Sequence, residues 1–182
     1  MLTRRLRYAL AAVIVVSLAG ATIALASKGP GKNGTQFHAH MIGYNEVPSL
    51  NSPGQGDVAL TVTDTSITFT LTYSGLTGPP SMSHIHVGQP GVNGGVSVFF
   101  CGGGGKPACP ASSSGTVTGT ITAANVVGPT AQGFAAGNIT PVIAALRAGF
   151  TYANMHTAAF PNGEIRGQIV RGHGGDDDDN DD

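Results

Sequence analysis

Apolar and polar residues alternate at every second position along much of the chain after Gln36. In segment 58–63 valine and leucine alternate with alanine and threonine, and in segment 67–72 isoleucine, phenylalanine and leucine alternate with threonine. This period places the apolar side chains of each segment on one face of a β-strand. Residues 64–66, between the two segments, are Asp, Thr and Ser, which favour a turn. The pattern predicts a β-hairpin with one buried face and one face toward water.

Further segments with the composition of short strands are separated by clusters of Gly, Pro, Asn and Ser. They are segments 37–42, 82–87, 96–101, 115–122, 150–156 and 164–170. Many short strands at regular spacing are typical of an antiparallel sandwich or barrel. We therefore expect an all-β fold, a single antiparallel Greek-key-like β-sandwich of about eight strands with one short helix. No repeat or linker divides residues 36–172, which predicts one domain.

The expected helix begins near Thr140. This residue can cap a helix whose first residue is Pro141, because an N–H is not needed at that position. Segment 142–146 continues with Val, Ile, Ala, Ala and Leu, and Gly149 can end the helix. A helix of about two turns is too short to be stable alone. We expect it to close one end of the sandwich.

The first 26 residues have the pattern of a secretory signal peptide. Three arginines precede an uncharged, mostly apolar run that ends at residues 24–26 in Ala-Leu-Ala, a sequence that signal peptidase recognises. We expect cleavage after residue 26, a flexible segment at 27–35, no membrane span in the mature chain, and a secreted location, extracellular or periplasmic. An uncleaved anchor is the alternative, because about 18 apolar residues can just span a bilayer. The paired arginines leave Sec and twin-arginine export both open.

The C-terminal residues 173–182 include six aspartates in the last seven positions. Their mutual repulsion predicts a disordered acidic tail. Loose binding of Ca²⁺ by these carboxylates is the alternative.

The overall composition excludes several classes of protein. The chain has 28 glycines in 182 residues, 10% charged residues, 41% hydrophobic residues and a net charge of -1. The glycines and the scarcity of Glu and Lys exclude a coiled coil. Without a surplus of basic residues, no nucleic-acid partner is expected. The apolar content argues against disorder throughout the chain.

The two cysteines of the chain, Cys101 and Cys109, flank a loop with four consecutive glycines. In an exported protein, such a pair is expected to form a disulfide. A loop this short gives a stabilisation of about 2–3 kcal/mol. Metal binding by the pair is the weaker alternative, because no histidine lies near it in the sequence.

Histidines are the candidate metal ligands. His84 and His86 are two residues apart on one predicted strand, so both side chains lie on one face. His156 ends another predicted strand, and His38 and His40 form a second His-x-His pair. Imidazole suits Zn²⁺ and Cu²⁺, and three ligands leave an open position. The first interpretation of the histidines is a structural role, with the rings hydrogen-bonded to loop carbonyls; a copper or zinc site at His84, His86 and His156 is the hypothesis set against it.

Three polar residues are candidates for supporting these histidines. Asn154, on the predicted face of His156, and Glu164 are expected to fix the imidazole tautomers. Glu164 and Arg166, two residues apart, are expected to form a surface ion pair worth less than about 1 kcal/mol. Glu46 lies beside a predicted turn and is expected to serve backbone geometry. No Ser-His-Asp order, phosphate loop or close pair of carboxylates predicts catalytic residues.

Three stretches carry a resemblance to a known family: 37–48 (FHAHMIGYNEVP), 83–88 (SHIHVG) and 152–169, which includes YANMHT and PNGEIRGQI. They resemble the CHRD domain, a module named from chordin and common in secreted bacterial proteins, over residues 36–171. The resemblance implies an extracellular β-sandwich module with no established enzyme activity. The family's recurring polar positions correspond to Asn45, Glu46, His84, His86, Asn154, His156, Glu164 and Arg166.

Other features fall outside this pattern. His38 and His40 occupy positions that the family leaves open, and the loop 101–109 looks like an insertion. A second resemblance, to copper/zinc superoxide dismutase, rests on the His-x-His strand and a closing Gly-x-x-Arg-Gly, but the chain lacks a His-rich zinc loop between His86 and His156. The leading hypothesis is a secreted, non-enzymatic module that binds or scaffolds an unknown extracellular partner. A secreted metal-binding protein is the alternative, and a dismutase-like enzyme ranks last.

Overall fold

The computed structural model describes residues 35–172. Its elements are β1 (Thr35–Ile42), β2 (Gln55–Val62), β3 (Ile67–Ser74), β4 (Pro80–Val87), β5 (Gly95–Cys101), β6 (Gly115–Ile121), α1 (Thr140–Arg147), β7 (Thr151–Thr157), β8 (Ile165–Gln168) and β9 (Val170–Arg171), with short 3-10 helices at Gly43–Asn45, Ala123–Asn125 and Thr130–Gln132. The predicted all-β fold is confirmed, and every predicted strand segment contains an observed strand. The expected signal peptide at 1–26, nearly all of the segment 27–35 and the acidic tail at 173–182 lie outside the described residues.

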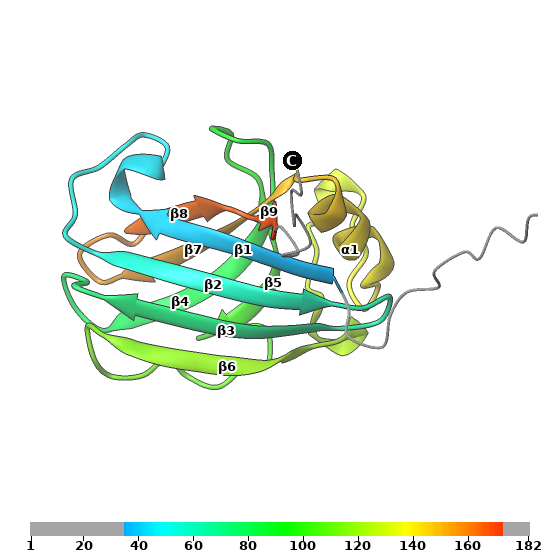
Figure 1. Cartoon of the computed structure of the whole chain (residues 1–182), viewed down its shortest axis with the longest axis horizontal. Helices are drawn as coiled ribbons and strands as arrows, with labels where there is room; N and C mark the ends of the chain where they lie inside the picture. The colour runs from blue at the N-terminus through cyan, green and yellow to red at the C-terminus, as the bar shows by residue number, and fades with distance from the viewer. Residues whose placement is uncertain (1–34, 173–182) are drawn as a thin grey trace, which may run out of the picture.

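The strands form one antiparallel sheet in the order β5-β4-β7-β8-β1-β2-β3-β6, and β9 pairs with β1. The sheet folds over, so that β1, β2, β3 and β6 form a layer in front of β4, β5 and β7 (Figure 1). Strand β8 pairs with both β7 and β1 and joins the layers. The connections β3–β4, β5–β6 and β6–β7 pass from one layer to the other, as expected of a Greek-key-like sandwich. Strands β5 and β6, at the ends of the order, approach each other without pairing.

The core lies between the two layers and is built by the predicted alternation. On β2 and β3, Val58 is opposite Leu71 and Leu60 is opposite Phe69. All four side chains are buried, whereas the threonines between them on β3 are exposed. From the other layer, the ring of Phe100 packs against Phe69 with centroids 4.8 Å apart. The hairpin with one buried face, expected from the sequence, is therefore confirmed.

Helix α1 covers one end of the sandwich (Figure 1) and buries Val142, Ile143 and Leu146. The predicted N-cap is wrong, because Thr140 is the first helical residue and the cap position is occupied by Ile139, which makes no side-chain cap. The side chain of Asn138 instead accepts a hydrogen bond from the Thr140 N–H. Among the described residues, no helix is long and apolar enough to cross a membrane.

The predicted Cys101–Cys109 disulfide is confirmed. Its loop extends from the end of β5 toward β6, where the Lys106 ammonium donates a hydrogen bond to the Thr120 carbonyl at 2.6 Å. The loop also lies against the ring of Phe99, since a Cβ added at Gly103 would be 2.5 Å from it. The glycines are therefore required for close contact with Phe99 as well as for bending.

Candidate metal centre

Strands β4 and β7 are antiparallel neighbours, and their register brings three histidines together. His84 is opposite Asn154, and His156 lies two residues further along β7. Residues directly opposite each other share a face of the sheet, as do residues two apart on one strand. The ring of His84 therefore lies between its two neighbours, with centroids 4.5 Å from His86 and 4.6 Å from His156. One ligand atom from each ring lies within 4.8 Å of the others.

This cluster occupies the face of β4 and β7 that points away from the core. Ile85, between the two histidines of β4, points the other way and is fully buried in the core. Loop segments cover the outward face, because segments 43–50, 88–94 and 158–163 make hydrogen bonds to side chains that project from it. The histidines are therefore enclosed between the sheet and these loops.

Aromatic contacts fix two of the rings. His84 is 2% exposed and meets the edge of the Phe99 ring at a centroid distance of 5.1 Å. His86 stacks on Tyr152, with centroids 4.5 Å apart and ring planes 8° from parallel. The Arg166 guanidinium also packs on Tyr152, 3.5 Å from the ring centroid. The two rings therefore have little freedom to turn away from the cluster.

Backbone carbonyls determine the tautomers of two histidines. The Nδ1 of His86 lies 2.8 Å from the Gly94 carbonyl, and the Nδ1 of His156 lies 2.9 Å from the Pro161 carbonyl. A carbonyl oxygen only accepts, so each Nδ1 must carry the proton, and in a neutral ring each Nε2 then has a free lone pair. Among the described residues, the buried Nε2 of His156 and Nδ1 of His84 have no hydrogen-bond partner. Such unpaired nitrogens are uncommon in a protein interior.

The electrostatic environment keeps the three rings neutral. Burial, together with the neighbouring His86 and His156, lowers the pKa of His84 to about 2. Burial is also the main cause that lowers the pKa of His86, to about 4, although its hydrogen bond to Gly94 opposes the shift. The pKa of His156 is lowered by burial as well, against the effect of its bond to Pro161. Neutral imidazole is the form that binds a metal ion.

Asn154 lies within the cluster's face, where its side-chain hydrogen bond raises the pKa of His86, and it also bonds to groups outside the cluster. Its Nδ2 donates to the Glu46 carboxylate at 2.6 Å and to the Ile165 carbonyl at 3.1 Å. The hydrogen bonds that orient His86 and His156 come from the Gly94 and Pro161 carbonyls. Loop carbonyls were the partners that the structural interpretation expected, but the sequence did not identify which residues supply them. A carbonyl has no sequence signal of its own, because every residue carries one.

Glu46 is a further buried group at the site. From its place beside a predicted turn, it was expected only to serve backbone geometry. Its carboxylate is close to Asn154, 108 positions away in the sequence. Burial raises the pKa of Glu46 to about 7, although the Asn154 hydrogen bond and the charge of Arg166 lower it. The resemblance to the CHRD pattern had singled out this position, whereas spacing and composition had not.

The expected surface ion pair between Glu164 and Arg166 is wrong, because both side chains are buried and no ion pair joins them in the described part of the chain. The Glu164 carboxylate accepts hydrogen bonds from the Ser52 hydroxyl, from the Thr77 N–H and hydroxyl, and from the Thr157 hydroxyl, at 2.6–2.9 Å. Burial alone would raise the pKa of Glu164, but these hydrogen bonds lower it overall. Glu164 therefore holds two loops against β7.

Arg166 fixes the loop over the histidines. Its guanidinium donates to the Asn93 side chain at 2.9 Å and to the Val92 carbonyl at 2.8 Å. The same loop continues to Gly94, whose carbonyl orients His86. Arg166 thus acts on the candidate metal centre through this loop and through Tyr152.

The second His-x-His pair lies apart from the cluster. His38 and His40 are exposed on β1, and the Nδ1 of His40 lies 2.8 Å from the exposed Asp57 carboxylate. In residues 35–172, the group of histidine, cysteine or carboxylate side chains close enough to share an ion consists of His84, His86 and His156.

Comparison with known proteins identifies the family. The family model of the CHRD domain matches residues 37–169, which include all three clustered histidines. No curated protein and no solved structure matches the chain. The match spans most of the sequence and the whole sandwich from β1 to β8. The chain therefore belongs to the CHRD domain family.

Proposed function

We propose that this CHRD domain is an exported module that binds one transition-metal ion, Zn²⁺ or Cu²⁺, through His84, His86 and His156. The observation that carries the proposal is that two strands aim three neutral imidazoles at one point, with two buried ring nitrogens left unpaired. A metal ion would give these nitrogens the partner that the protein does not supply.

The donor set selects the class of metal. Three nitrogen donors suit zinc and copper, whereas Ca²⁺ and Mg²⁺ take oxygen ligands. Because a Zn–N bond is about 2.0–2.1 Å long and zinc sites are tetrahedral, two ligand nitrogens of one ion lie about 3.3 Å apart. Ligand atoms separated by up to 4.8 Å would therefore move together by up to about 1.5 Å on binding.

The proposal gives the domain a binding role rather than a catalytic one. Three protein ligands leave a fourth position at which a partner's side chain or a small molecule can complete the coordination. The carboxylates nearest the cluster are held by Asn154 and by loop hydroxyls. Superoxide dismutation is the rival activity, and an assay of the copper-loaded protein separates the two, because a binding module gives no activity above that of the buffer.

Export is the second part of the proposal. The charged and apolar pattern of residues 1–26 supports a signal peptide, and the Cys101–Cys109 disulfide is compatible with an oxidising compartment. N-terminal sequencing of the protein from the culture medium or periplasm is expected to begin at Ser27. Intact Met1 in the membrane fraction would instead favour an anchor.

Calorimetric titration tests the metal site. The mature chain should bind one Zn²⁺ with an affinity reduced more than about 100-fold by His86→Ala, since changes behind the ligands alone cost about 10–100-fold. His40→Ala is the matched control, because it removes an exposed histidine outside the cluster and should leave the tight site unchanged. Equal affinities of the wild type and the His86→Ala variant would return the three histidines to a structural role.

A further inference from the structure

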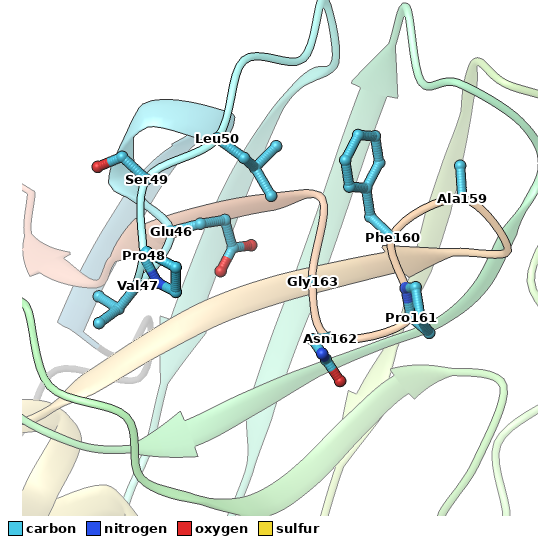
Figure 2. Close-up of a pocket in the computed structure, with 10 residues that line it drawn as sticks. All are labelled: Glu46, Val47, Pro48, Ser49, Leu50, Ala159, Phe160, Pro161, Asn162 and Gly163. Carbon is cyan, nitrogen blue, oxygen red and sulfur yellow. The ribbon is translucent and has the colours of Figure 1, made fainter.

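A cavity of about 340 Å³ lies beside the candidate metal centre, between segments 46–50 and 159–163. Its walls are mostly apolar and come from Val47, Pro48, Leu50, Phe160 and Pro161. Figure 2 shows Leu50 and Phe160 on the two sides of the space, with the carboxylate of Glu46 pointing into it. The cavity therefore combines apolar walls with one acidic group.

The Glu46 carboxylate in this cavity is incompletely paired. The residue is 8% exposed, and Asn154 donates to its Oε1 at 2.6 Å. Among the described residues, no hydrogen-bond donor reaches its Oε2. The nearest cationic side chain that acts on it, Arg166, makes its hydrogen bonds to the loop at 89–93. Oε2 is not one of the buried polar atoms that lack a partner, so it faces the open space of the cavity, where a ligand can donate a hydrogen bond to it.

The cavity is held open by contacts that do not depend on a ligand. A Cβ added at Gly163 would be 2.7 Å from one Glu46 oxygen, and this glycine has a φ of +125°, so the chain passes closely beneath the carboxylate. The Gly163 N–H donates to the Phe160 carbonyl, and the Pro161 carbonyl holds His156. The segment is therefore fixed at both its turn and its contact with β7.

We propose that this cavity binds a small organic cation, a primary alkylammonium group whose N–H groups donate to Glu46 Oε2 and whose alkyl chain packs against Leu50 and Phe160. The ammonium supplies N–H donors and a positive charge at Oε2, and a charge-assisted hydrogen bond is roughly twice as strong as a neutral one. The volume suits a short chain, since ligand pockets of proteins begin at about 300 Å³. This site is separate from metal binding and does not rest on it.

The test is an NMR titration of the mature, ¹⁵N-labelled chain with n-butylammonium chloride at pH 8, above the pKa of about 7 of Glu46, without added metal. Saturable shifts are expected for amides of segments 46–50 and 159–163. n-Butanol, which keeps the chain length and lacks the charge, is expected to bind at least about tenfold more weakly. A second titration, with Nα-acetyl-lysine methylamide, distinguishes a free amine from a lysine side chain of a protein. Tighter binding than that of n-butylammonium assigns the site to lysine, and weaker binding assigns it to free amines.

Two variants complete the design. Glu46→Gln keeps the size of the side chain and removes its charge, and it should lower n-butylammonium affinity about tenfold or more; Asp57→Asn, a change of an exposed carboxylate on β2, should have no effect. If Glu46→Gln does not fold, Phe160→Ala replaces it, and it should weaken n-butylammonium binding by removing an apolar wall. Equal binding of n-butanol and n-butylammonium, unchanged affinity in the variants, or shifts outside the two segments would overturn the proposal.

Discussion

In both layers of the sandwich, side chains point alternately toward the core and away from it, but the outward faces of the two layers have different surroundings. On β3, Thr68, Thr70 and Thr72 face water, and they lie opposite three exposed threonines of the neighbouring strand β6. On β7, every residue from Thr151 to Thr157 is buried. Both layers bury one face in the common core, so the difference lies in what covers the other face. The front layer is bare, whereas loops close over the back layer.

These loops turn an outward face into a second, polar interior. Its contents are the histidine cluster, the Tyr152–Arg166 stack and the Glu46 carboxylate; loop groups hold His86, His156 and Arg166 by hydrogen bonds, and Asn154 of β7 holds Glu46. Polar groups inside a protein cost free energy unless they are paired. The bare layer can therefore accept many substitutions, and the covered layer can accept few.

The sharpest contrast between the layers is expected from Glu164→Ala. The change leaves the Thr77 N–H and the hydroxyls around it without an acceptor, which should lower the free energy of unfolding by about 4 kcal/mol. Thr70→Ala on the bare layer should change it by less than about 0.5 kcal/mol. Urea denaturation of both variants measures this, and similar losses in the two would remove the distinction between the layers.

Removal of the disulfide should give the next largest effect. A Cys101→Ser, Cys109→Ser double variant frees the loop that packs on Phe99, and loop entropy predicts a loss of about 2–3 kcal/mol. Thermal or denaturant unfolding with and without reductant provides the comparison, because reductant should affect the wild type and leave the variant unchanged. A variant as stable as the oxidised wild type would show that the loop needs no cross-link.

Glu46 should make the covered layer sensitive to pH. Because its pKa is raised from 4.5 to about 7 in the folded chain, the fold favours the protonated form. Its contribution to stability is complete below pH 4.5 and is lost as the pH rises through about 7. Relative to Glu46→Gln, the wild type should lose about 2 kcal/mol between pH 4.5 and pH 8. Parallel pH profiles of the two proteins would contradict this assignment.

The smallest expected effect concerns metal affinity in mild acid. An ordinary histidine site weakens below about pH 6, because protons compete for the ligands. Here burial is the main cause that lowers the pKa of His86 to about 4 and that of His84 to about 2, and it lowers the pKa of His156 as well, so proton competition at pH 5.5 is weaker than at exposed histidines. Zinc affinity should then change less than about threefold between pH 7 and pH 5.5. A tenfold loss over this range would mean that the rings are solvated like exposed histidines.

Sequence alternation predicted the strands, the threonine face and the sharing of one face by His84 and His86, because these follow from the local period. It could not predict that Glu164 and Arg166 are buried, since the same two-residue spacing describes an exposed strand. Their burial depends on the loop at 88–94 and on Ser52, 112 positions from Glu164. Long-range packing of loops thus decided the roles of both residues, and the contact of Glu46 with Asn154 has the same origin.

The unpaired edges of β5 and β6 bear on how the protein behaves at high concentration, where copies of the chain can associate. An unpaired strand edge can recruit the edge of another copy and start aggregation. Here the disulfide loop extends from β5 toward β6, where the Lys106 ammonium donates a hydrogen bond to the Thr120 carbonyl. The Val127 N–H donates a hydrogen bond to the Ser97 carbonyl of β5. A lysine at a sheet edge also resists the approach of a second strand, because its charge would have to be desolvated. The cross-linked loop is therefore expected to oppose self-association through these strand edges.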